Sequence, residues 1–110
     1  GNLICKLYNC APDGNSFSDT DVMISSDGRN YAVPAGSEIR LTPGQSITLL
    51  PGQFHSFWAE EGFEKVMLTE VSKVNDDTVD NHFYEKAGRF PEIEEDEAPL
   101  FLLVSDYKKI

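Results

Sequence analysis

Glycine and proline divide the first part of this chain into short segments, and this spacing constrains the fold more than any other feature of the sequence. The segments between the turn residues have the length of strands and are too short for ordinary helices. The turn residues are Asp13-Gly14, Asp27-Gly28, Pro34-Ala35-Gly36, Pro43-Gly44, Pro51-Gly52 and Gly62. The spacing therefore predicts an all-β fold.

The segments between the turns are rich in β-branched and aromatic residues, which favour a pleated and half-buried surface. Short antiparallel strands of this kind are typical of sandwiches, jelly rolls and small barrels, and periodicity alone does not choose among these. We expect strands at residues 3–8, 20–26, 29–33, 38–42, 46–50, 54–59, 64–72 and 100–105.

Three of the turns have a predictable geometry. Asp27-Gly28 indicates a two-residue hairpin, because a type I′ turn requires a positive φ at both central positions. Pro43-Gly44 and Pro51-Gly52 suit type II turns, since proline fixes φ at the first central position and glycine accepts the left-handed second position.

Residues 72–99 lose the strand pattern and form a long polar and acidic region, which ends in Glu92-Ile93-Glu94-Glu95-Asp96-Glu97. A long excursion of this kind is usually functional or loosely ordered. With 110 residues, the chain is expected to be one domain, 1–110, that contains this acidic loop region.

The charge of the chain limits its partners. Nine Lys and Arg stand against nineteen Asp and Glu, which gives a formal net charge of −10. Phosphate backbones and anionic lipids repel such a chain, so we expect no nucleic acid and no membrane partner. A small neutral ligand or a metal cation suits the charge better. Cys5 and Cys10 suit reduced thiols, and we expect the protein in the cytoplasm.

His55 lies at the start of a predicted strand, three residues after the Pro51-Gly52 turn. This arrangement resembles the second cupin motif, G-(x)n-P-x-G-x-x-H, whose histidine points into the mouth of a small β-barrel and binds a divalent metal. Here the glycine follows the proline directly, which the motif tolerates. Without the motif, a lone histidine would more often be structural. Trp58 has the opposite strand parity, so it faces outward if His55 faces inward.

Further blocks extend the resemblance along the chain: Gly1-Asn2-Leu3-Ile4, Pro43-Gly44-Gln45-Ser46-Ile47, His55-Ser56-Phe57-Trp58, Glu70-Val71-Ser72, Val74-Asn75-Asp76-Asp77, Asp80-Asn81-His82-Phe83 and residues 89–97. In this order they resemble the C-terminal half of the D-lyxose isomerase family. The Glu-Val-Ser and Val-Asn-Asp-Asp blocks are specific to that family rather than to cupins in general.

The resemblance implies a cupin-type β-barrel or jelly roll and an enzyme that interconverts an aldose and a ketose, D-lyxose and D-xylulose. It also implies a homodimer and a divalent metal, most commonly Mn²⁺, with Zn²⁺ or another ion as the alternative. Family members carry an H-x-H-x(n)-E stretch and an active-site lysine upstream of the point that matches Gly1. Of the metal ligands, this chain holds only His55, and one histidine cannot hold a catalytic metal. We therefore expect a barrel that is incomplete on its N-terminal side: a fragment, a chain whose partner supplies the rest, or a lost site.

Glu70 is the first candidate for the catalytic base that moves a proton between C1 and C2 of the sugar. It follows the apolar residues 66–69, and a carboxylate in such a place usually has a partner, a metal or a task. The alternative is an exposed strand end. Glu85 and Asp80 are the next candidates for the base.

Asp80, His82, Glu85 and Arg89 are the candidate sugar-binding residues. Asp80 could instead form a turn, and His82 and Arg89 could instead hold the long loop through charged hydrogen bonds.

Two other functions stay open from the sequence. One is a non-catalytic cupin that binds a sugar or a structural metal. The other is an acidic interaction module in which residues 100–107 add a strand to the sheet of a partner. An upstream H-x-H-E strand would favour the enzyme.

Overall fold

The computed structural model describes residues 1–74, 76, 82–85, 94 and 96–102. The chain divides into two units, Gly1–Asp76 and Asp77–Ile110, and each is described here by itself.

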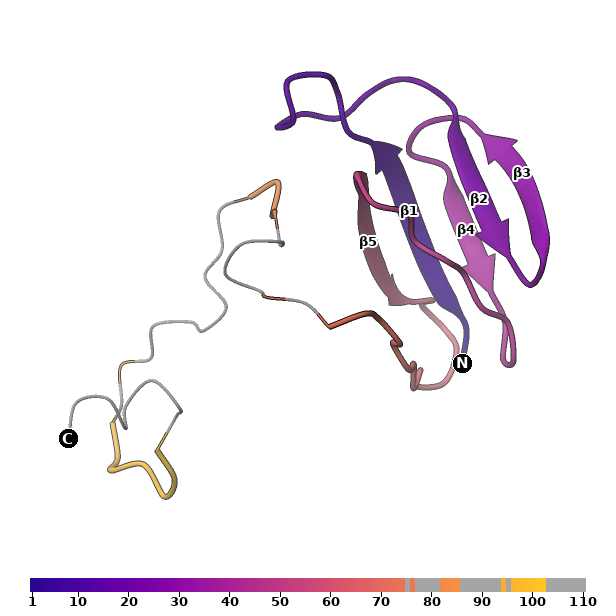
Figure 1. Ribbon diagram of the computed structural model, residues 1–110. Coiled ribbons are helices and arrows are strands. Elements are labelled where there is room, and N and C mark those ends of the chain that lie inside the picture. Colours follow the sequence, from indigo (N-terminus) through magenta and orange to yellow (C-terminus); the bar gives the residue numbers. More distant parts are fainter. Residues whose placement is uncertain (75, 77–81, 86–93, 95, 103–110) are drawn as a thin grey trace. The chain divides into compact units, whose positions relative to one another are not determined.

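All regular structure in the described residues is β-structure, which confirms the predicted class. The strands are β1 (Leu3–Asn9), β2 (Val22–Ser26), β3 (Arg29–Val33), β4 (Glu38–Leu41) and β5 (Gln53–Ala59). They form a three-stranded antiparallel sheet in the order β4-β1-β5 and a two-stranded antiparallel sheet of β2 and β3 (Figure 1). Closure into a cupin barrel stays a prediction.

The core lies between the two sheets of the first unit. Because side chains alternate along a strand, Cys5 and Leu7 of β1 share one face and pack against Val22 and Ile24 of β2. The cluster consists of Cys5, Leu7, Val22, Ile24, Ile39 and Leu41, with Leu3, Val33 and Ile47 packed against it. Burial raises the pKa of the Cys5 thiol, which keeps it protonated and unreactive, as expected for a core position.

The β2–β3 hairpin turns as the sequence predicts. Ser26 pairs with Arg29, which leaves a two-residue loop, and both loop residues have a positive φ, 50° at Asp27 and 76° at Gly28. Aspartate tolerates this conformation better than most residues with a side chain, because its short polar group can bond locally.

The tip of this hairpin is bound to the segment that leads toward β5. The Asp27 carboxylate accepts hydrogen bonds from the Ser46 hydroxyl at 2.7 Å and from the Ser46 backbone N–H at 3.1 Å. The Ser26 hydroxyl donates to the Ser46 carbonyl at 2.6 Å. The bonds from Ser46 lower the pKa of Asp27, because they stabilise its charged form.

The strand predicted at residues 46–50 is wrong. This segment makes one isolated bridge, between Ser25 and Thr48, and no ladder. After this bridge the chain turns at Pro51-Gly52 and enters β5, so no second backbone bridge to β2 follows.

The strand predicted at residues 64–72 is also wrong. No strand occurs there, and Met67 and Val71 are 94% and 93% exposed. Strand propensity needs neighbouring strands to pack against, and the described residues provide none for this segment. Residues 100–102 are likewise outside any strand, and the remainder of the strand predicted at 100–105 lies outside the described residues.

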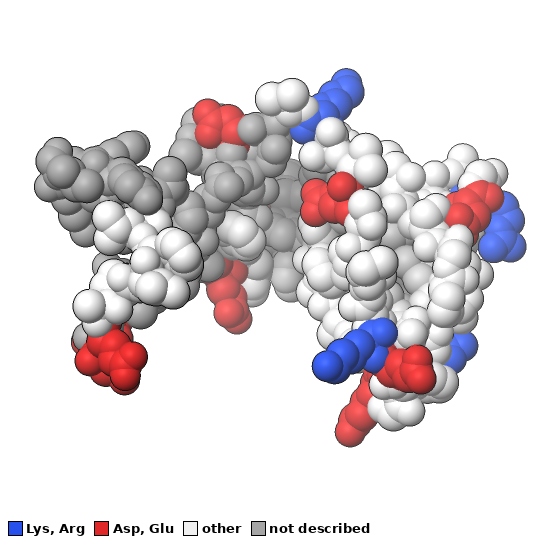
Figure 2. Space-filling view, turned by 90° about the horizontal axis from the view of Figure 1, so that it is seen from below, with Lys and Arg blue, Asp and Glu red and all other residues white. Residues whose placement is uncertain are grey.

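The charged side chains are scattered over the described surface. On the face shown in Figure 2, Asp and Glu as well as Lys and Arg lie scattered among uncharged residues, and no continuous basic band crosses the described part of this face. In the same described part of the chain, no helix is long and apolar enough to cross a membrane.

Candidate functional site

His55 lies on the face of β5 that continues the core face of β1. It stands directly opposite Leu7 in the β1–β5 ladder, and Phe57 stands opposite Cys5. Trp58 directly follows Phe57 and pairs with Ile4, so it lies on the other face of the sheet, as the strand parity predicts.

The imidazole of His55 is exposed although its ladder partner Leu7 is buried. β2 covers the face of β1 and β4 through the core cluster, but no residue of β5 belongs to that cluster. The ring of Phe57, on the same face, lies parallel to the imidazole with the two centroids 6.4 Å apart. His55 is therefore open to a ligand on the core side of the sheet.

The Pro51-Gly52 turn sets the start of β5. Gly52 has the positive φ that the sequence predicts, 78°, and the Gln53 N–H donates to the Leu50 carbonyl at 3.2 Å. The side chain of Gln53 adds a second bond, because its Oε1 accepts from the Leu50 N–H at 2.9 Å. The Gln53 Nε2 also donates to the Met23 carbonyl of β2 at 3.1 Å.

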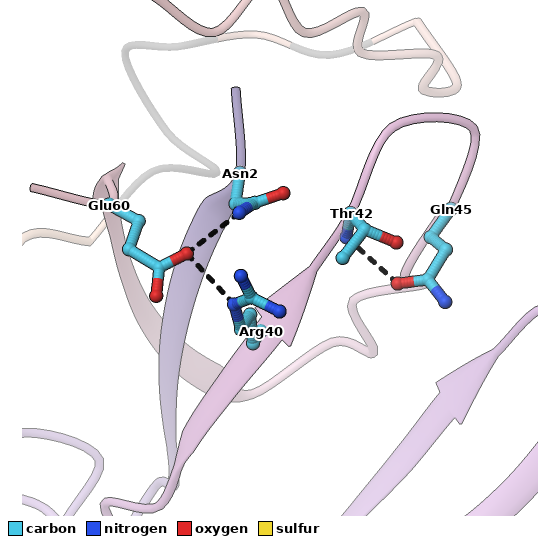
Figure 3. Close-up of polar contacts among 5 residues, drawn as sticks. All are labelled: Asn2, Arg40, Thr42, Gln45 and Glu60. Atoms are coloured by element: carbon cyan, nitrogen blue, oxygen red, sulfur yellow. Dashed lines mark hydrogen bonds and ion pairs between the residues drawn. The ribbon is translucent and has the colours of Figure 1, made fainter. Parts of the chain in front are cut away.

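The Pro43-Gly44 turn has the same construction. Gly44 has a φ of 85°, and the Gln45 N–H donates to the Thr42 carbonyl at 3.0 Å. The Gln45 Oε1 in turn accepts from the Thr42 N–H at 2.8 Å (Figure 3). The repeated Pro-Gly-Gln was visible in the sequence, but our reasoning from the sequence did not assign a role to either glutamine.

A polar cluster on the opposite face ties the ends of the sheet together. The Glu60 Oε2, directly after β5, accepts from the Asn2 Nδ2 at 2.9 Å and from the Arg40 Nε at 2.8 Å (Figure 3). The hydrogen bond from Arg40 is the main cause that lowers the pKa of Glu60, and the bond from Asn2 adds to it. Arg40 also lies over the ring of Phe63, 5.4 Å from its centroid. This contact belongs to no sequence motif, so it could not be foreseen.

Glu70 lies in the first unit, exposed and outside any strand. The apolar strand that was predicted to end at Glu70 is absent, so this carboxylate does not lie at a buried strand end. Its candidacy as a base depends on the Glu70-Val71-Ser72 block alone.

The candidate sugar-binding residues belong to the second unit. His82 and Glu85 are described and exposed there, whereas Asp80 and Arg89 lie outside the described residues. His55 belongs to the first unit, so the roles of these residues at a site with His55 stay predictions.

The donors of the described residues do not by themselves form a metal centre. Within that part of the chain, no group of three His, Cys, Asp or Glu side chains is placed to hold an ion. His55 supplies one exposed imidazole nitrogen donor, which suits Mn²⁺ or Zn²⁺, but a catalytic site needs further ligands.

Known proteins are similar to this chain along nearly its whole length. A sequence model described as D-lyxose isomerase matches residues 1–107. The D-lyxose/D-mannose isomerase of Escherichia coli O157:H7 is 46% identical over 109 residues, which cover 99% of this chain and 48% of that protein. The D-lyxose/D-mannose isomerase of Serratia proteamaculans is 48% identical over 107 residues, which cover 97% of this chain and 46% of that protein.

The chain thus spans about half the length of the curated relatives that it matches. By the family match and by both relatives, the chain belongs to the D-lyxose isomerase family.

Proposed function

We propose that this chain is part of a sugar isomerase that interconverts D-lyxose or D-mannose with the corresponding ketose. The observation that carries the proposal is the family match over residues 1–107, together with relatives named D-lyxose/D-mannose isomerase. The position of His55 supports it, because an exposed imidazole on the core side of β5 is open to a small ligand.

The chemistry of such an isomerisation is a proton transfer between neighbouring carbons. A base removes the proton from C2 of the open-chain aldose while the C1 carbonyl oxygen gains a proton, which gives an enediol. The base then returns its proton to C1 while the C2 hydroxyl loses its own proton, which gives the ketose. We assign the base to Glu70, whose exposed carboxylate is open to a ligand, with Glu85 and Asp80 as the next candidates. In the same proposal, Asp80, His82, Glu85 and Arg89 bind the sugar hydroxyls.

We further propose that His55 is one ligand of a divalent metal, with Mn²⁺ as the first candidate and Zn²⁺ as the alternative. The remaining ligands then come from residues outside the described set or from a partner chain. A bound divalent ion in this class of reaction polarises the carbonyl and the neighbouring hydroxyl of the sugar. The homodimer and the cytoplasmic location stay predictions.

The test is an isomerase assay on the full-length protein with D-lyxose and with D-mannose, in parallel with residues 1–110 alone. Formation of ketose by the full-length protein, with a kcat in the usual range of about 1 to 1,000 per second, supports the proposal. Binding of either sugar without turnover would instead favour the non-catalytic cupin. No binding and no turnover would refute the proposal.

A further inference from the structure

Gln53 lies where the chain passes from one sheet to the other. The segment before it bridges to β2 through Thr48, and the strand that begins with it pairs with β1. Gln53 itself pairs with Asn9 at the end of the β1–β5 ladder. His55 follows two positions later and therefore lies on the same face of β5.

The side chain of Gln53 completes the free edge of β2. Carbonyl groups of alternate residues in a strand point toward the same edge, and β3 already occupies one edge of β2. On the other edge, the Ser25 carbonyl accepts from the Thr48 N–H at 2.8 Å. The Met23 carbonyl accepts from the Gln53 Nε2 at 3.1 Å. An amide side chain thus takes the place that a backbone donor would have in a continuous ladder.

The two glutamine turns differ in this one respect. Both side chains accept the N–H of the residue that opens their turn, Thr42 for Gln45 and Leu50 for Gln53. In the described part of the chain, the bond to β2 is made by Gln53, and no such bond is found for Gln45. Substitutions at Gln45 and Gln53 can therefore be compared to separate two effects: the loss of a bond within a turn, and the loss of the bond that attaches β5 to β2.

We propose that Gln53 is a positioning residue for His55, which it holds at a fixed place relative to β2. The β1 ladder fixes β5 along one side, and the Gln53 amide fixes its first residue to the second sheet. The inference deepens the proposed function and depends on it for the role of His55 toward the sugar. The placement of the imidazole itself can be tested without any substrate.

The decisive variants are Gln53→Glu and its matched control Gln45→Glu. Each keeps an oxygen that can accept the bond within its own turn. Gln53→Glu also replaces the Nε2 donor by an oxygen that faces the Met23 carbonyl. Gln45→Glu removes no such bond, because the side-chain bond of Gln45 in the described part of the chain lies within its own turn. Gln53→Ala and Gln45→Ala form a second pair, in case the carboxylate prevents folding.

The primary measurement is nuclear magnetic resonance of the ring signals of His55 in protein labelled with ¹⁵N-histidine. The chain has two histidines, so His82 serves as the internal reference. We expect the His55 ring signals to shift and broaden in Gln53→Glu and to stay unchanged in Gln45→Glu. Unchanged His55 signals in Gln53→Glu, or equal shifts in both variants at equal melting temperature, would overturn the inference.

The second measurement is the turnover of D-lyxose by the full-length protein. Positioning residues around a functional side chain commonly affect affinity or activity by 10- to 100-fold, so we expect a loss of about tenfold in kcat/KM for Gln53→Glu. For Gln45→Glu we expect a change of less than about twofold. Equal losses in the two variants would contradict the positioning role. Absence of turnover in the unmodified protein would refute the proposed function, while the ring signals would still decide the role of Gln53.

Discussion

Leu7 and His55 are direct partners in the β1–β5 ladder, yet their side chains have different surroundings. Leu7 is 1% exposed in the core cluster, and His55 is open to solvent. We expect Leu7→Ala to lower the free energy of unfolding by about 2–5 kcal/mol, because it leaves a cavity in a packed core. We expect His55→Ala to change it by less than about 0.5 kcal/mol, as for most surface substitutions. Urea denaturation of both variants measures the difference, and similar losses would contradict the description of the core.

The functional prediction for His55 follows from the same exposure. If His55 is a metal ligand as proposed, His55→Ala in the full-length protein should strongly reduce the bound metal and leave the packing undisturbed, because the side chain is exposed. Mass spectrometry of the metal content measures this effect, with circular dichroism as the control for the fold. Unchanged metal content would assign His55 a structural role.

A separate prediction concerns Glu70 and the proton transfer. If Glu70 is the base as proposed, Glu70→Gln keeps the size of the side chain but removes the basic oxygen, so general-base catalysis of about 10² to 10⁴ should be lost from kcat. Exchange of the substrate C2 proton with deuterated solvent should be lost together with turnover. A variant that still exchanges this proton at the normal rate would transfer the role to Glu85 or Asp80.

Among the elements, the β2–β3 hairpin tip should make stability depend on pH. The pKa of Asp27 is lowered in the folded chain by the hydrogen bonds from Ser46. A lowered pKa contributes stability above the pKa of the unfolded carboxyl, about 3.9, and this contribution is lost as the pH falls through the lower folded value. Asp27→Asn should therefore melt at a lower temperature than the parent chain at pH 7. The difference in melting temperature between the two chains should become smaller as the pH falls below about 4. A difference that does not change with pH would contradict this account.

The elements also show what the sequence can and cannot predict. The hairpin at Asp27-Gly28 and the turns at Pro43-Gly44 and Pro51-Gly52 were predictable, because their geometry depends on the φ of one or two residues. The strand at residues 64–72 was not, because a strand needs a partner that the local sequence does not specify. For the site, the motif predicted the face of β5 on which His55 lies. The bond from Gln53 to β2 was not predictable, because it joins segments that are far apart in the chain.

For the whole molecule, the length relative to the family leads to a prediction about activity. The chain matches about half of each relative, and its described residues contain no group of three metal-ligating side chains. We expect residues 1–110 alone to show no appreciable turnover of D-lyxose with added Mn²⁺, whereas the full-length protein is active. A discontinuous assay for D-xylulose measures both. Turnover by residues 1–110 at the rate of an ordinary enzyme would refute the proposal that further ligands are needed.

β5 is an edge strand of its sheet in the described part of the chain, and its sequence, Gln-Phe-His-Ser-Phe-Trp-Ala, contains no Lys, Arg, Asp or Glu. Charged residues on an edge normally discourage two such strands from pairing. Solutions of residues 1–110 should therefore self-associate through β5 as the protein concentration rises. The single tryptophan of the chain, Trp58, lies in this strand. A concentration-dependent change in its fluorescence would reveal the association and would set the dilution at which spectra of the monomer can be recorded.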